Sequence, residues 1–225
     1  TEAEVYADMA RAQIANGGEA YLFNLFDSGD PMSPEYLHLL HGKPQPLSPT
    51  QRTLEEGDLV KTEFHASYGG YLVAADMSVV LGDAPPEVRR IHEVSRECSE
   101  NARPLFEPGT RLEDLWEAFR EPAREADMDF ISLGFHGHGL SSPEFPTVTF
   151  PQKATRLYPE GLSWHLGSGR SQEDIRLEEG MVFGTNVDLY DPNWRNDVGL
   201  MSGETVLVTE TGPEMLLEIP DELVV

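Results

Sequence analysis

Two runs of alternating residues joined by a glycine pair constrain the fold of this chain most strongly. In residues 59–66 (Leu-Val-Lys-Thr-Glu-Phe-His-Ala) the even positions share one strand face, and the odd positions, including Lys61, Glu63 and His65, share the other. A Tyr-Gly-Gly-Tyr turn at 68–71 follows, and residues 72–81 continue as a second strand-like run. Because a Gly-Gly pair between two such runs is typical of a tight turn, the pattern predicts an antiparallel hairpin.

Two amphipathic helical patterns follow the hairpin. The first predicts a helix over about 87–106 with Asp83 as its cap, and the second predicts a helix from Thr110 to about residue 126. Pro104 and Pro122 are expected to kink, end or break these helices. The remaining expected elements are a helix at 2–17, strands at 20–26, 181–189 and 198–210, a short element at 213–219, and loops at 31–53 and 151–174. The pattern predicts one α+β domain over residues 1–225, with a mostly antiparallel sheet and helices on one side.

Acidic residues outnumber basic residues by 40 to 16, which gives a net charge of −24. Nucleic acid and anionic membrane surfaces are therefore unfavourable partners, because their phosphates would be repelled, whereas a basic partner stays open. The N-terminal residues are neither basic nor apolar, so no signal peptide is expected. The single cysteine, Cys98, excludes an internal disulfide and fits a reducing cytoplasm, which is the expected location.

A short glycine-rich segment carries two histidines that are two residues apart. It reads Phe-His-Gly-His-Gly-Leu from position 135, and Glu144 follows it between two prolines. In an extended chain His136 and His138 share one face. The local sequence allows either a turn with incidental histidines or part of a functional site.

Taken in order, these pieces resemble the C-terminal catalytic domain of the pita-bread peptidase family, which includes methionine aminopeptidase, aminopeptidase P, prolidase and the metal-free creatinase. The hairpin that begins at Gly57-Asp58, the two helices joined by Pro108-Gly109, the histidine segment, and segments 180–183 and 207–212 follow the family's order. The resemblance implies a pita-bread fold, a curved and mostly antiparallel sheet with helices packed on its outer face. It also implies a possible homodimer and an N-terminal domain that this chain lacks.

The resemblance further implies where the family's metal ligands would fall. Its metallopeptidases hold two divalent metals with two aspartates, one histidine and two glutamates. Those positions fall here on Glu63, Ala74, His136, Asn186 and Gly203. Alanine and glycine offer no ligand, and a neutral amide is a poor bridging ligand, so the usual dimetal centre is predicted to be absent and no cofactor is expected. A two-residue shift would place His65 and Asp76 at the first two positions, and this alternative stays open.

Three functions fit these residues. The first is a hydrolase or lyase that acts without the dimetal centre on a small C–N-bonded substrate, by analogy with creatinase and Xaa-Pro peptidases. Its expected catalytic residues are His136, Glu63 and His65. Its expected substrate-binding residues are His138, Tyr71, Asp76, Glu144, Asn186 and Asp188. The second function is a non-catalytic module that binds a peptide or a basic partner. The third is a single-metal hydrolase with a site rebuilt from His65, Asp76, His136 and His138.

Overall fold

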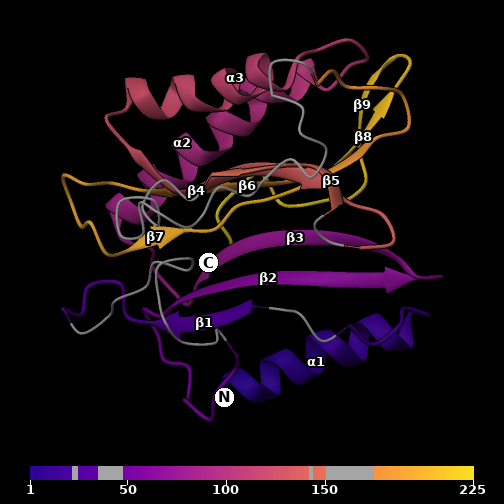
Figure 1. Cartoon of the computed structure of the whole chain (residues 1–225). Helices are drawn as coiled ribbons and strands as arrows, with labels where there is room; N and C mark the ends of the chain where they lie inside the picture. The colour runs from indigo at the N-terminus through magenta and orange to yellow at the C-terminus, as the bar shows by residue number, and fades with distance from the viewer. Residues whose placement is uncertain (22–24, 35–47, 142–143, 151–174) are drawn as a thin grey trace, which may run out of the picture.

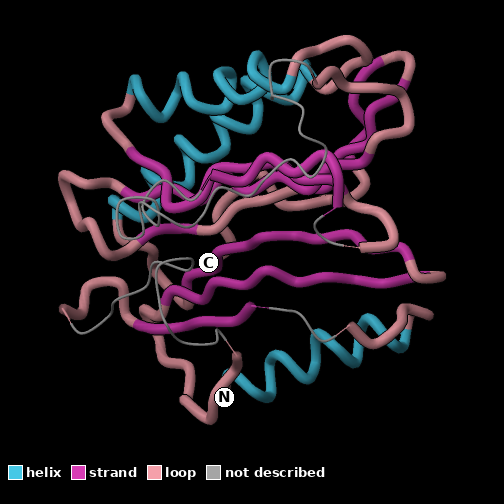
Figure 2. Tube along the Cα trace, in the orientation of Figure 1, coloured by secondary structure: helices cyan, strands magenta, loops and turns pink. Residues whose placement is uncertain are grey.

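The protein is arranged as two facing sheets with helices on both outer sides (Figures 1 and 2). The structure is a computed structural model that describes residues 1–21, 25–34, 48–141, 144–150 and 175–225, with only the backbone at 132–133 and 145–150. Helix α1 (Glu2–Ala15) lies against the smaller sheet, and the other helical segments cover the larger sheet. The predicted loop at 151–174 lies outside the described residues, as does most of the one at 31–53.

The smaller sheet contains the predicted hairpin. Its strands are β1 (Leu25–Gly29), β2 (Leu59–Tyr68) and β3 (Tyr71–Val80), antiparallel in the order β1-β2-β3. Gly69 and Gly70 form the turn with φ angles of +59° and +81°, which glycine adopts without strain. This turn fixes the register, so that Glu63 lies opposite Asp76 and His65 lies opposite Ala74. The alternating pattern of residues 59–66 therefore gave the strand and its two faces correctly.

The larger sheet is also antiparallel. Its strands are β4 (Asp129–Gly137), β5 (Glu144–Phe150), β6 (Val182–Tyr190), β7 (Gly199–Leu200), β8 (Thr205–Thr209) and β9 (Gly212–Met215). Their order is β5-β4-β6-β8-β9, with β7 paired to β6. The single strand predicted at 198–210 is divided, because Gly203 leaves the larger sheet and pairs with Asp76 of β3. Residues 201–204 thereby link the two sheets.

The helical segments α2 (Pro86–Ala102), the 3-10 turn η2 (Arg103–Leu105) and α3 (Leu112–Glu125) match the predicted helices. The predicted caps were wrong, since α2 begins after Pro85 and α3 after Arg111, without a capping side chain. Pro122 also does not break α3. Its missing N–H leaves the carbonyl of Ala118 open, and Asn101 Nδ2 donates to that carbonyl at 2.8 Å. No helix in the described ranges is long and apolar enough to cross a membrane.

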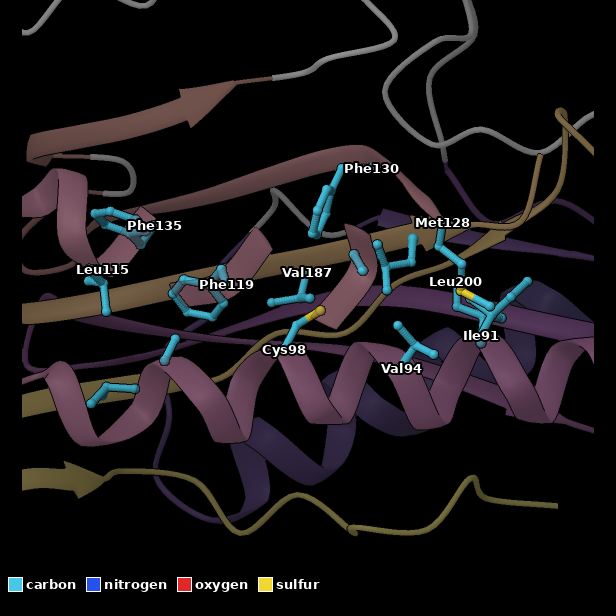
Figure 3. Close-up of a cluster of buried hydrophobic side chains, with 14 of the residues drawn as sticks. Ile91, Val94, Cys98, Leu115, Phe119, Met128, Phe130, Phe135, Val187 and Leu200 are labelled. Carbon is cyan, nitrogen blue, oxygen red and sulfur yellow. The ribbon is translucent and has the colours of Figure 1, made fainter. Parts of the chain in front are cut away.

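The main hydrophobic core lies between these helices and the larger sheet (Figure 3). Phe119 of α3 stacks on Phe135 of β4 with 6.0 Å between ring centroids, and Val187 of β6 lies in the same cluster. Cys98 of α2 is buried there, and burial raises the pKa of its thiol to about 12. An apolar thiol with so high a pKa is a packing residue. This core leaves the opposite face of the larger sheet to meet β2 and β3.

Candidate functional site

Buried polar residues line the facing sides of the two sheets. We call this set the polar cluster: Lys61, Glu63 and His65 from β2, Asp76 from β3, His136 and His138 from β4 and its end, and Asn186 and Asp188 from β6. Strand alternation explains the arrangement, since every second residue points to the same side of a strand. Each of these side chains is less than a tenth exposed. Because buried polar groups are costly unless they are paired, such a concentration indicates a functional site.

The carboxylates of the hairpin form the acidic part of the polar cluster. Glu63 and Asp76 face each other across β2 and β3, and His65 Nε2 lies 3.4 Å from Glu63 Oε1. Asn186 Nδ2 donates a hydrogen bond of 2.5 Å to Asp76 Oδ2. The second oxygen, Asp76 Oδ1, is buried without a hydrogen-bond partner among the described residues. One oxygen of the Asp76 side chain therefore has a hydrogen-bond partner among the described residues, and the other, Oδ1, can accept a hydrogen bond from a ligand.

The histidines form the second part of the polar cluster. The rings of His136 and His138 are 4.7 Å apart between centroids, and those of His138 and His65 are 6.1 Å apart. Gly139, next to His138, accepts a backbone hydrogen bond of 2.9 Å from Leu72 of β3, which brings this segment to the hairpin. Neither ring nitrogen of His138 has a hydrogen-bond partner within the described part of the chain. The glycine-rich segment is therefore part of a buried site and more than a turn.

Gly184 makes room for these rings. It lies opposite His136 in the pairing of β6 with β4. A Cβ atom at position 184 would lie 2.1 Å from Nε2 of His138 and 3.0 Å from Cε1 of His136. Real Cβ atoms do not approach that closely, so any side chain at position 184 would push the histidine rings aside.

Burial keeps the acids of the polar cluster protonated to unusually high pH. It raises the pKa of Glu63 to about 7. Burial, with the charges of Glu63 and Asp188, raises the pKa of Asp76 well above its ordinary value, although the hydrogen bond from Asn186 opposes this rise. Burial and the charge of Glu63 also raise the pKa of Asp188, against the attraction of Lys61. An acid with a pKa near 7 can both donate and accept a proton at neutral pH.

The same burial keeps His136 and His138 neutral. It lowers the pKa of His136, against hydrogen bonds to Gly137 and Asn186. Burial, together with the charges of His136 and His65, lowers the pKa of His138 to about 3. A neutral imidazole carries one N–H donor and one lone pair. The polar cluster therefore combines neutral imidazoles with a titrating acid.

The residues at the family's ligand positions do not fit a dimetal centre. A side chain at position 203 is impossible in this backbone, because its Cβ would lie 2.2 Å from the Thr185 carbonyl oxygen and 2.5 Å from Asp76 Oδ2. The NH₂ group of Asn186, a hydrogen-bond donor, points at Asp76. Across the described ranges, no group of three or more His, Cys, Asp or Glu side chains is arranged to hold a metal ion. The finding also covers the four residues of the hypothetical single-metal site, His65, Asp76, His136 and His138.

Two predicted substrate-binding residues lie elsewhere. Tyr71 is 64% exposed at the hairpin turn, and strand alternation puts it on the face of β3 opposite to Asp76. Its assignment to the site was therefore wrong, and it lines an apolar groove of about 780 Å³ beside α1. Glu144 begins β5, and its carboxylate lies against Gly139 and accepts a hydrogen bond of 3.4 Å from Ser141. It is half-buried and supports the turn after His138.

Sequence reasoning missed one member of the polar cluster, Lys61. It is fully buried, and it shares its strand face with Glu63 and His65. That shared face was visible in the alternation of residues 59–66. Because lysine side chains are almost always exposed, the sequence offers no reason to expect Lys61 inside the protein. Its burial is visible only in the structure.

A family model for metallopeptidase family M24 matches residues 1–210. The chain belongs to metallopeptidase family M24. Among its relatives, a probable dipeptidase PepE from Mycobacterium tuberculosis is 26% identical over 229 residues, which cover the whole chain and 52% of the relative. A methionine aminopeptidase from Aquifex aeolicus is 25% identical over 195 residues, which cover 80% of the chain and 69% of the relative.

Solved structures of M24 proteins share the fold. Dipeptidase PepE from Mycobacterium ulcerans matches the whole M24 chain and 52% of its own length, with a TM-score of 0.73 and 23% identity. Prolidase from Pyrococcus furiosus matches 97% of the chain and 56% of its own length, with a TM-score of 0.71 and 24% identity. The predicted family and pita-bread fold are confirmed. The chain spans about half the length of these dipeptidase and prolidase relatives.

Proposed function

We propose that this M24 chain is a peptidase-like hydrolase or lyase that acts on a small C–N-bonded substrate without the dimetal centre. The observation that carries the proposal is the polar cluster itself. It brings an acid with a pKa near 7, Glu63, together with the neutral histidines His136 and His138, and Asp76 accepts a hydrogen bond from Asn186, which stands at a position implied to hold a metal ligand. The M24 relatives, named dipeptidases, aminopeptidases and prolidases, support a hydrolase of this general class.

The proton transfers of such a hydrolysis have donors and acceptors in the polar cluster. Neutral His136 accepts a proton from water as the water oxygen bonds to the substrate carbon. Protonated Glu63 gives its proton to the nitrogen that leaves as the C–N bond breaks. His65, at 3.4 Å from Glu63, orients that carboxyl group and takes part in its reprotonation.

The remaining residues fit a substrate that carries a carbonyl-type oxygen and a cationic group. The ring nitrogens of His138 have no hydrogen-bond partner in the described ranges, so its N–H can bind the oxygen. His138 resists taking a positive charge because burial and two histidines lower its pKa. Asp76 Oδ1, which has no hydrogen-bond partner among the described residues, suits an ammonium or guanidinium group. Asn186 holds Asp76 in place for this contact.

A second candidate is a non-catalytic module that binds a peptide. The apolar groove between α1 and the outer face of β2 and β3 favours it, because Met9, Phe64, Tyr68 and Tyr71 line this groove and both tyrosines are exposed. A homodimer and a cytoplasmic location remain predictions for this chain.

Elemental analysis of the purified protein tests the proposal first. Manganese, cobalt or zinc at near one atom per chain would contradict it. If metal is far below that level, release of amine from a panel of small amides and guanidino compounds separates an enzyme from a binding module.

Variants then test the catalytic roles. His136→Ala and Glu63→Gln are each expected to lower turnover by about 10²-fold, which is typical for removal of one general acid or base. His92→Ala, on α2 outside the polar cluster, is the control and is expected to retain turnover. Unchanged turnover in His136→Ala would reject its role as the base.

A further inference from the structure

The polar cluster contains a cation of its own. Lys61 is 0% exposed and lies near the start of β2, opposite Asp27 of β1 and Ser78 of β3. Its ammonium nitrogen lies 3.9 Å from Asp27 Oδ2. Moving an ammonium group out of water costs several kcal/mol, so a fully buried lysine requires negative partners.

The charge of Lys61 also acts on a carboxylate of the other sheet. Asp188 of β6 is 0% exposed, and the attraction of Lys61 opposes the rise that burial causes in the pKa of Asp188. Ser202, which belongs to the link between the sheets, donates its backbone N–H to Asp188 Oδ1 at 3.4 Å. Lys61 is thus paired with a carboxylate of the smaller sheet, and its charge acts on one of the larger sheet.

The position of this cation is informative because of its neighbours. Glu63, two residues along the same strand face, stands at the first ligand position implied by the family, and its charge acts on Asp76 and Asp188. Carboxylates so close together need a positive charge among them or must hold protons. Metal ions supply that charge in a dimetal site. Here a side chain of the protein supplies part of it.

We infer that Lys61 is a positioning residue whose ammonium group takes the electrostatic place of a metal ion and keeps divalent cations out of the polar cluster. The inference rests on the proposed function without the dimetal centre. It explains how Asp188 tolerates full burial near Glu63 and Asp76. It also predicts that the polar cluster would attract a divalent cation if the charge of Lys61 were removed.

Binding of Mn²⁺ to the full chain, measured by titration calorimetry at pH 7.5, tests the inference. Lys61→Met keeps the length and the apolar stem of the side chain and removes its charge. We expect it to bind Mn²⁺ at least about tenfold more tightly than the wild type, because the unbalanced carboxylates attract a cation. Lys61→Arg keeps the charge and is expected to bind Mn²⁺ as weakly as the wild type.

The outcomes separate the two proposals. Tight, stoichiometric Mn²⁺ binding by the wild type would contradict the proposed function. Weak binding by the wild type and Lys61→Met alike would overturn the role of Lys61 and leave the proposed function standing. If Lys61→Met does not fold, the double variant Lys61→Met/Asp188→Asn decides the matter, because it removes one charge of each sign. A folded double variant supports the inference, and an unfolded one overturns it.

Discussion

Asn186 and Asp76, which are 110 residues apart in the chain, share a buried hydrogen bond of 2.5 Å that joins the two sheets. Asn186 lies on β6 of the larger sheet and Asp76 on β3 of the smaller one. The amide gives Asp76 a donor that carries no charge. In this chain a side-chain amide therefore stands where the family resemblance implies a carboxylate ligand.

Asn186→Asp should destabilise the protein in a pH-dependent way. At pH 8 a second buried carboxylate would face Asp76 without a donor, and we expect a loss of about 3 kcal/mol in the free energy of unfolding. At pH 5 the two acids can share a proton, so the loss should be smaller. Urea denaturation at both pH values measures this difference. The control Asn193→Asp lies in an exposed turn, and an equal loss for Asn186→Asp at both pH values would argue against a buried pair.

Glu63 should make the protein less stable as the pH rises. Its pKa is about 7 in the folded protein, above its ordinary value of 4.5, so the folded state holds more protons between these values. The contribution of Glu63 is fully present below about pH 4.5 and is lost as the pH passes 7. It amounts to roughly 3 kcal/mol.

Glu63→Gln provides the test, because glutamine does not titrate. We expect the stability of this variant relative to the wild type to increase by roughly 3 kcal/mol between pH 4.5 and pH 8. Glu179→Gln, in an exposed turn, is the control. Parallel pH profiles for the wild type and Glu63→Gln would show that Glu63 titrates as an ordinary glutamate.

Gly184→Ala should disturb the histidines specifically. The new methyl group would overlap the ring of His138, so we expect a loss of about 1–3 kcal/mol in stability and at least a tenfold loss in turnover. The double variant His138→Ala/Gly184→Ala should recover the stability but not the turnover, since the obstructing ring is gone. Thermal unfolding of the three proteins measures this coupling. A double variant no more stable than Gly184→Ala would mean that the strand itself needs the glycine.

Gly203→Ala should behave differently, because the nearest atom is the backbone carbonyl oxygen of Thr185 at 2.2 Å. A backbone atom in a strand cannot turn away as a side chain can, so we expect a loss of about 3 kcal/mol. Adding Asp76→Ala should not rescue this loss. Urea denaturation, with Ser202→Ala as the neighbouring control, provides the measurement. Rescue by Asp76→Ala would show that the carboxylate, and not the carbonyl, excludes a side chain.

Much of the fold could be predicted from the sequence, because its strongest signals are local. Strand alternation placed Glu63 and His65 on one face, and the Gly-Gly turn gave the hairpin. Two of the predictions that failed depended on distant contacts. Pro122 stays helical because Asn101, on another helix, donates a hydrogen bond to the carbonyl of Ala118, which lacks its usual helical partner. The last long strand is divided because Gly203 pairs with Asp76.

The sequence by itself determined the family resemblance and the faces of the hairpin strands, and it predicts that Ala74, Asn186 and Gly203 stand at three of the family's ligand positions. Only the tertiary structure decided that Asp76 bonds to Asn186 and that Lys61 is buried beside Asp27. The physical reason is that periodicity fixes which residues share a face of a strand, whereas burial depends on what covers that face. Here the larger sheet covers the face of β2 that carries the charged side chains. The polar residues of the larger sheet complete a buried polar cluster with them.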